Sequence, residues 1–236
     1  MFISTERKWI FMNIPGCVDS KIDSQLSDQS NIMGMDNFDR SNEDITSNSN
    51  SSTSNSFFKY DNIRDIKLNF NNHVSEDWTY YYKFTFIKNP WKRTYDLYNM
   101  YCRMRGLGIK AVIEVMSNIN SFEEFISCKH LLCGNQYDYI YKTPDQQKWS
   151  FNNPFVTLNH SQDIINLYRC GGSLVNSVFN VDNGLNEKSK KILSKFGISL
   201  DYEGGDYEYR DMYSKSMRKS VAKFFEDDIN FFMLKF

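Results

Sequence analysis

The chain has 236 residues, a formal net charge of −1 and 41% hydrophobic residues. This length can bury one substantial core, so we expect a single domain over residues 1–236. The near-zero net charge excludes a general electrostatic attraction to nucleic acid, so any phosphate binding must be local. Aromatic residues make up 16% of the chain, which argues against disorder throughout.

The amino-terminal segment Met1–Met12 carries charges where a secretory signal needs its apolar region. No later run approaches the ~20 apolar residues of a membrane span. We therefore expect a soluble, cytoplasmic protein without a transmembrane segment. The five cysteines have no framework spacing, which favours reduced thiols. Cys128 and Cys133 resemble half of a zinc site, but no second Cys/His pair accompanies them, so no metal is expected.

The first predicted strand is Lys8–Met12, and it runs into a small turn at residues 13–20. Phosphate-binding loops begin in this way. From about Asp23 to Ser56 the composition shifts to Ser, Asn and Asp, which predicts a disordered insertion with a short helix near its start. A functional tail is the alternative. A solvated surface loop is favoured because loop-closure entropy grows only slowly with length.

Order is expected to resume at Phe57–Tyr60, and an extended run is predicted to lead to Leu68–Ser75. A buried strand follows at residues 84–87, where aromatic and β-branched residues are concentrated.

A helix is predicted to start directly after this strand. Pro90 suits the first helical turn, and Gly106 is a stop signal. The free amides and partial positive charge of this helix start, together with Lys88 and Arg93, favour a phosphate ligand.

The remaining predicted elements are helices. Their segments are residues 121–126 with Ser121 as the cap, 161–168, 187–196 and 216–232. Apolar residues at helical spacing in the last segment are assigned to the core. His160 is expected to cap or precede a helix rather than to catalyse.

Four segments together match the signatures of one enzyme family. Residues 86–98 read Phe-Ile-Lys-Asn-Pro-Trp-Lys-Arg-Thr-Tyr-Asp-Leu-Tyr, against the family's Phe-Val-Arg-Asn-Pro-Trp/Tyr-x-Arg-x-x-Ser-x-Tyr. Asn13–Lys21 matches more weakly the opening signature His-Ile-Pro-Lys-x-x-Gly-Thr-Ser. Asn72–Ser75 is similar to a Gly-His-Val-Ser motif, and Tyr213 with residues 221–229 is similar to the closing helix. The chain thus resembles the carbohydrate-type sulfotransferases, which use 3′-phosphoadenylyl sulfate (PAPS).

The resemblance implies an α/β fold with a P-loop-like parallel sheet flanked by helices. It implies transfer of a sulfonate group from PAPS, without a metal, to a hydroxyl of a carbohydrate or similar acceptor. His73 would be the base that takes the hydroxyl proton. The residues that would contact the donor's 3′-phosphate are Lys88, Arg93 and Asp96. Those at its 5′-phosphosulfate are Gly16, Cys17, Val18, Asp19, Ser20 and Lys21.

The chain departs from the family pattern at its charged positions. Gly16 stands in place of a lysine that holds the leaving group, and Lys21 is the candidate substitute. Lys88 replaces an arginine and loses its bidentate fork. Asp19 and Asp96 add carboxylates that would repel a phosphate. These departures support an alternative: a catalytically impaired sulfotransferase-like protein that binds a nucleotide, glycan or protein partner. A P-loop kinase is disfavoured because Gly-x-x-x-x-Gly-Lys-Ser/Thr is absent.

Overall fold

The computed structural model describes residues 1–34, 63–136, 140, 175–202 and 209–236, and in this part of the chain five strands form one mixed sheet. The order across the sheet is β3-β1-β2-β4-β5. The strands are β1 (Phe2–Ser4), β2 (Trp9–Met12), β3 (Ile32–Met33), β4 (Tyr82–Ile87) and β5 (Ser177–Asn180). The α/β class is therefore as predicted.

Only part of the sheet is parallel. Strands β2, β4 and β5 are parallel, whereas β1 runs antiparallel to β2 and β3. The expectation of a wholly parallel sheet was wrong, because residues 5–8 form a tight connection that can only join antiparallel neighbours. Neither β1 nor the short edge strands β3 and β5 were predicted.

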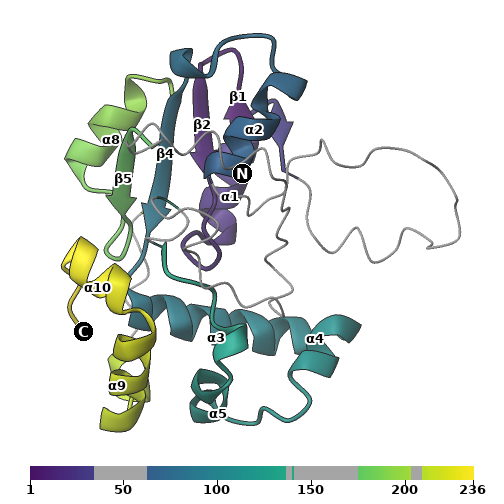
Figure 1. Cartoon of the computed structure of the whole chain (residues 1–236), viewed down its shortest axis with the longest axis vertical. Helices are drawn as coiled ribbons and strands as arrows, with labels where there is room; N and C mark the ends of the chain where they lie inside the picture. Colours follow the sequence, from purple (N-terminus) through teal and green to yellow (C-terminus); the bar gives the residue numbers. More distant parts are fainter. Residues whose placement is uncertain (35–62, 137–139, 141–174, 203–208) are drawn as a thin grey trace, which may run out of the picture.

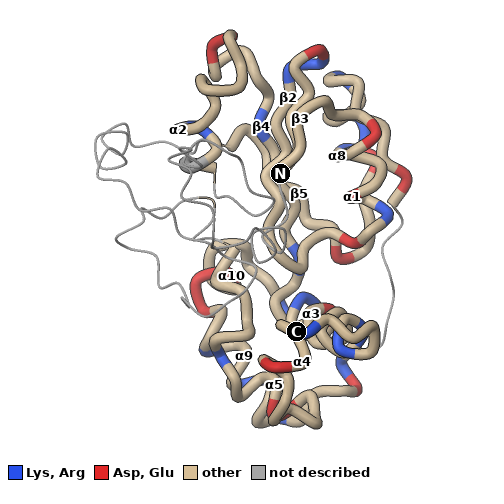
Figure 2. Tube along the Cα trace, turned by 90° about the vertical axis from the view of Figure 1, so that its right-hand side faces the viewer, with Lys and Arg blue, Asp and Glu red and all other residues tan. Residues whose placement is uncertain are grey.

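The sheet is buried on both faces. Strand β2 is apolar throughout, whereas in β4 the buried Phe84 and Phe86 alternate with the buried polar residues Lys83 and Thr85. Trp9, Phe11 and Phe84 point to the face covered by α1 (Ser20–Ser27) and α8 (Glu187–Ser194). Ile10 and Met12 point to the opposite face, covered by α2 (Ile63–His73). Figures 1 and 2 show α2 on one side of the strands and α1 with α8 on the other.

The segment predicted as a disordered insertion begins with regular structure. Helix α1 extends through its start and buries Ile22 and Leu26, and residues 32–33 then pair with β1 as β3. Residues 35–56, and Phe57–Tyr60 after them, lie outside the described residues.

The extended run predicted to lead to Leu68 was wrong in its described part, because residues 63–67 already belong to α2, which continues to His73. Ile63, Ile66 and Phe70 recur at helical spacing and are fully buried against the sheet. This amphipathic packing outweighs the β-favouring local composition that suggested an extended chain.

A second group of helices packs beyond the carboxyl ends of the strands (Figure 1). It contains α3 (Pro90–Gly106), α4 (Lys110–Val115), α5 (Phe122–Ser127) and α9 (Lys215–Phe224), which share one apolar cluster. Helix α3 starts at Pro90 as predicted, and Ser121 forms a capping box with Glu124 at the start of α5. The segment 161–168 and His160 lie outside the described residues.

The single carboxy-terminal helix predicted over residues 216–232 is two helices. Helix α9 ends at Phe224, and α10 (Glu226–Phe232) follows a non-helical Phe225 with φ −105° and ψ 34°. Three acidic residues open α10, where the helix dipole favours negative charge. The break allows Phe225 and Asp228 both to be buried.

Short 3-10 turns complete the described elements: η3 (Trp78–Tyr80), η4 (Lys129–Leu131) and η6 (Tyr209–Met212). Basic and acidic residues are interspersed along the trace in Figure 2, in keeping with the near-zero net charge. Among the helices of the described ranges, none combines the length and apolar character needed to cross a bilayer.

Candidate functional site

The two signature segments meet at the carboxyl edge of the sheet. Because β2 and β4 are parallel neighbours, the turn after β2 and the start of α3 lie side by side. Arg93 of α3 donates from Nε to the carbonyl oxygen of Pro15 at 2.8 Å. Gly16 has φ +76°, and a Cβ there would lie 3.0 Å from Leu97 Cγ and 3.1 Å from Arg93 Cγ. The left-handed backbone favours glycine at this position, and a larger residue would require the Leu97 and Arg93 side chains to shift by a few tenths of an ångström.

Arg93 is fully buried and is bound to protein groups. Its Nη1 donates to the carbonyl oxygen of Gly134 at 2.9 Å and lies 4.0 Å from the buried Asp228 carboxylate. The guanidinium also stacks over the ring of Phe225, 5.6 Å from its centroid. Arg93 therefore joins the turn after β2, the segment after η4 and the start of α10. These contacts join parts of the protein to one another, whereas a residue that binds phosphate is expected to direct its N–H groups to the phosphate.

Lys88 is paired with Asp96, which the resemblance assigns to the same phosphate site. Its Nζ donates to Asp96 Oδ2 at 2.9 Å, and its side chain is 5% exposed. Burial lowers the pKa of Lys88, but the Asp96 carboxylate, with smaller contributions from Tyr202 and Cys17, makes the net shift upward. The ammonium thus stays charged, with its charge compensated inside the protein.

The amides at the start of α1 already have an anionic acceptor. Asp19 is the N-cap, and its Oδ1 accepts from the backbone N–H groups of Lys21 and Ile22, both at 3.0 Å. Ser20 is the exposed first residue of α1. Val18 packs against the apolar cluster between the sheet and helices α1 and α8. Lys21 points away to Asp201, 3.1 Å distant on the surface.

Cys17 belongs to a buried polar cluster that sequence reasoning did not detect. Gln136 Oε1 accepts from the Cys17 thiol at 2.9 Å and from the Lys88 backbone N–H at 2.7 Å. Gln136 Nε2 donates to the Lys88 carbonyl oxygen and to Asp228 Oδ2. Gln136 lies in no recognisable motif, so only its position in space reveals this bridge. Burial raises the pKa of Cys17 to about 12, which makes the thiol a poor nucleophile at neutral pH.

His73 is at the other end of the sheet. Helix α2 ends with His73, and the chain continues through η3 into the start of β4 (Figure 1). Glu76 in this connection pairs with Lys8, the residue before β2. The strands thus separate His73 from the turn and α3 start, and six residues of β4 span about 20 Å. The structure does not bring His73 to the other predicted site residues.

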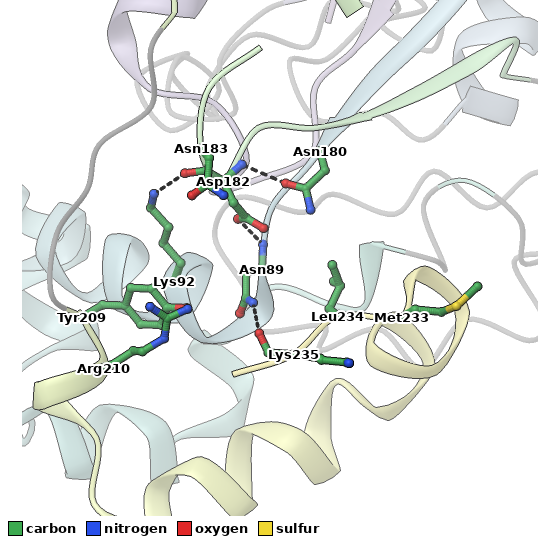
Figure 3. Close-up of a pocket in the computed structure, with 10 residues that line it drawn as sticks. All are labelled: Asn89, Lys92, Asn180, Asp182, Asn183, Tyr209, Arg210, Met233, Leu234 and Lys235. Carbon is green, nitrogen blue, oxygen red and sulfur yellow. Dashed lines mark hydrogen bonds between the residues drawn. The ribbon is translucent and has the colours of Figure 1, made fainter. Parts of the chain in front are cut away.

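A cavity of about 330 Å³ lies beside this cluster, at the carboxyl ends of β4 and β5 (Figure 3). Asp182, directly after β5, accepts the backbone N–H of Asn89 on Oδ1 at 2.6 Å. The Asp182 carbonyl oxygen accepts from Lys92 Nζ at 2.6 Å. Lys92 occupies a variable position of the signature, and Asp182 follows a strand that was not predicted, so neither was a candidate.

The predicted PAPS site does not fit the donor as the described residues stand. The donor needs free amides in the first turn and free cations at its 3′-phosphate. In the structure, Asp19 accepts hydrogen bonds from the backbone N–H groups of this turn. Asp96 forms an ion pair with Lys88, and Arg93 donates to backbone carbonyl oxygens. Within the described ranges, no three His, Cys, Asp or Glu side chains come together as metal ligands.

Comparison of the chain with protein-family models, with curated proteins and with solved structures gave no match in any of the three.

Proposed function

We propose that this chain is a sulfotransferase-like domain, built on a P-loop-like α/β fold, that binds a ligand but no longer transfers sulfonate. The observation that carries the proposal is the ion pair between the buried Lys88 and the partly buried Asp96. The resemblance assigns both positions to the donor's 3′-phosphate. Here a carboxylate of the protein supplies the negative charge that the donor phosphate would bring.

Binding of the donor at this position would be unfavourable for an electrostatic reason. A phosphate approaching Lys88 would also approach the Asp96 carboxylate, only 2.9 Å from that ammonium. Two negative charges sharing one cation in a poorly hydrated place repel each other strongly. Lys88 also lacks the bidentate fork with which arginine holds phosphate.

The first turn presents the same difficulty. A 5′-phosphate at the start of α1 would have to displace Asp19 from two backbone amides. In addition, Gly16 supplies no cation for the leaving group, and a single preorganised donor is worth about a hundredfold or more in rate.

Sulfonate transfer from PAPS to a carbohydrate hydroxyl is the second candidate. It is favoured by the proximity of the turn at residues 13–20 to the start of α3, held by the hydrogen bond from Arg93 to Pro15. In this case Asp96 and Asp19 would turn away when the donor binds, and the base would be a group other than His73.

Calorimetric titration with adenosine 3′,5′-bisphosphate separates the two candidates. We expect no binding to the wild-type protein at 1 mM nucleotide. The double variant Lys88→Arg/Asp96→Ser restores both family residues. We expect it to bind the nucleotide at least about tenfold more tightly than the wild type, because it gains one charge-assisted contact. Asp28→Ser, which removes an exposed carboxylate at the end of α1, is the matched control and should resemble the wild type.

The decisive contrary result is micromolar binding by the wild type together with transfer of labelled sulfonate to a glycan panel. That result would establish the enzyme and remove the ligand-binding proposal. Circular dichroism melts of each variant verify that the comparison is made between folded proteins.

A further inference from the structure

We propose that the cavity at the carboxyl ends of β4 and β5 binds a small phosphate monoester that carries hydroxyl groups. This inference rests on the binding role proposed above and names a ligand class for it. It places the ligand outside the PAPS cradle, by which we mean the turn at residues 13–20 with the first residues of α1. The cavity volume of about 330 Å³ is at the lower end of the range for small-molecule sites. Crevices at the carboxyl ends of parallel strands are also where open α/β sheets bind ligands.

The charge of the lining favours an anion. The lining includes three basic residues, Lys92, Arg210 and Lys235, and one acidic residue, Asp182. Lys92 Nζ donates to the Asp182 carbonyl oxygen, and Lys235 meets Asn89 through its backbone carbonyl oxygen. The Asp182 carboxylate is engaged with the backbone N–H of Asn89 at the start of α3. These basic residues come from three different parts of the chain: α3, η6 and the segment after α10 (Figure 3).

Arg210 is the side chain best suited to hold the phosphate. Its guanidinium lies over the ring of Tyr209, 5.2 Å from the centroid, which orients the fork of donors. Neither a hydrogen bond nor an ion pair joins the Arg210 side chain to the described part of the chain. Arginine binds phosphate through two parallel N–H donors. Arg210 therefore differs from Lys88 and Arg93, whose donors are directed to protein acceptors.

The polar groups opposite Arg210 suit hydroxyls. Asn180 and Asn183 line the cavity, and Asn180 Oδ1 accepts from the Asp182 backbone N–H at 2.8 Å. That bond fixes the amide orientation and leaves its NH₂ group as a donor. Amides that both donate and accept recognise hydroxyl groups, whereas the cations recognise the phosphate. A polyol or sugar monophosphate has both features in a molecule of suitable size.

The test is calorimetric titration of the full chain with ribose 5-phosphate, with ribose and inorganic phosphate as partial ligands. We expect ribose 5-phosphate to bind more tightly than either part. Arg210→Gln should weaken its binding about tenfold or more, because it removes a charge-assisted contact. Arg103→Gln is the matched control, since it removes an exposed guanidinium in the last turn of α3, away from the cavity, and binding should be unchanged.

Amide chemical shifts recorded during the titration locate the ligand. Shifts confined to Asn89, Asp182 and Arg210 support the proposal. Shifts at Gly16 and Ser20 would place the anion in the PAPS cradle and overturn the inference. Equal binding by Arg210→Gln, or no binding of ribose 5-phosphate at 10 mM, would also overturn it. Neither outcome depends on the titration with adenosine 3′,5′-bisphosphate. A negative result here therefore leaves the proposal that the chain no longer transfers sulfonate unaffected.

Discussion

Aspartate side chains compensate most of the positive groups at the carboxyl edge of the sheet. Asp19 accepts the amides of α1, Asp96 pairs with Lys88, and Asp182 accepts the first amide at the start of α3. Asp228 lies beside Arg93 in the interior. Asp19 and Asp96 would each repel a phosphate bound where the resemblance places the donor.

Replacing Arg93 tests whether its role is structural. Arg93→Ala would leave the Asp228 carboxylate buried without its cation, and we expect a loss of about 3–5 kcal/mol in the free energy of unfolding, as for other broken buried pairs. Urea denaturation measures the loss. Arg103→Ala, an exposed residue of the same helix, should change it by less than about 0.5 kcal/mol. Similar values for both variants would mean that Arg93 does not support the fold.

The buried Cys17 thiol makes stability depend on alkaline pH. Its folded pKa, about 12, lies above the reference value of 9.0, so above pH 9 the unfolded chain releases a proton that the folded protein keeps. The contribution is complete below pH 9 and is lost as the pH rises towards 12, by about 1.4 kcal/mol per pH unit. Urea denaturation of Cys17→Ala at pH 8 and pH 10 should show a smaller decrease than the wild type. Parallel decreases would assign the pH dependence to other groups.

At the scale of elements, α1 and α3 begin in comparable ways. Both follow a parallel strand of the sheet, and both have a side-chain N-cap: Asp19 accepts two N–H groups of α1, and Asn89 accepts the Trp91 N–H of α3. Asp182 in turn accepts the backbone N–H of Asn89. A helix start at this edge is an anion site in principle, but a side-chain cap occupies it in the protein.

Removal of the α1 cap should destabilise the fold and uncover the amides. Asp19→Ala is expected to lower the free energy of unfolding by about 1 kcal/mol, and Asp19→Ser to retain most of it, because serine also caps. Thermal or urea unfolding provides the measurement. Asp28→Ala, at the other end of α1, is the comparison, since the Asp28 side chain makes no cap. Equal effects at both ends would indicate that Asp19 acts through net charge alone.

At the scale of the whole molecule, one sheet separates two chemically different ends. The buried cluster around Arg93 and Gln136 lies at the carboxyl ends of β2 and β4, while α2 delivers His73 near their amino ends. A catalytic residue must come within hydrogen-bond reach of its substrate, so His73 could act only after a rearrangement of the fold. We therefore expect His73→Ala to leave any ligand binding at the carboxyl edge unchanged, as measured by the same titrations.

The order of the strands predicts where the fold opens last. In the described sheet, β4 has a parallel partner on each side and is buried, whereas β3 is a two-residue edge strand. Amides of Phe84 and Phe86 should exchange only through global unfolding, and those of Ile32 and Met33 through cheaper local opening. Hydrogen exchange followed by NMR at neutral pH distinguishes the two. Equal protection would show that β3 opens only with the whole sheet.

The α/β class followed from the resemblance, whereas local signals in the sequence predicted most of the β4 strand, the place of Pro90 in the first turn of α3 and the cap of α5 at Ser121. These features depend on neighbours in the chain: apolar runs, proline at a first turn, and a serine three residues before a glutamate. The short strands β1, β3 and β5 depend on pairing with distant segments, and the break at Phe225 accompanies burial of Asp228 against Arg93. The helix start and the family resemblance together assigned Lys88, Arg93 and Asp19 to one predicted phosphate-binding site. Only the tertiary structure decided which partners satisfy those charges, because a charge binds the nearest opposite group in space, and those groups come from α1, α3 and α10.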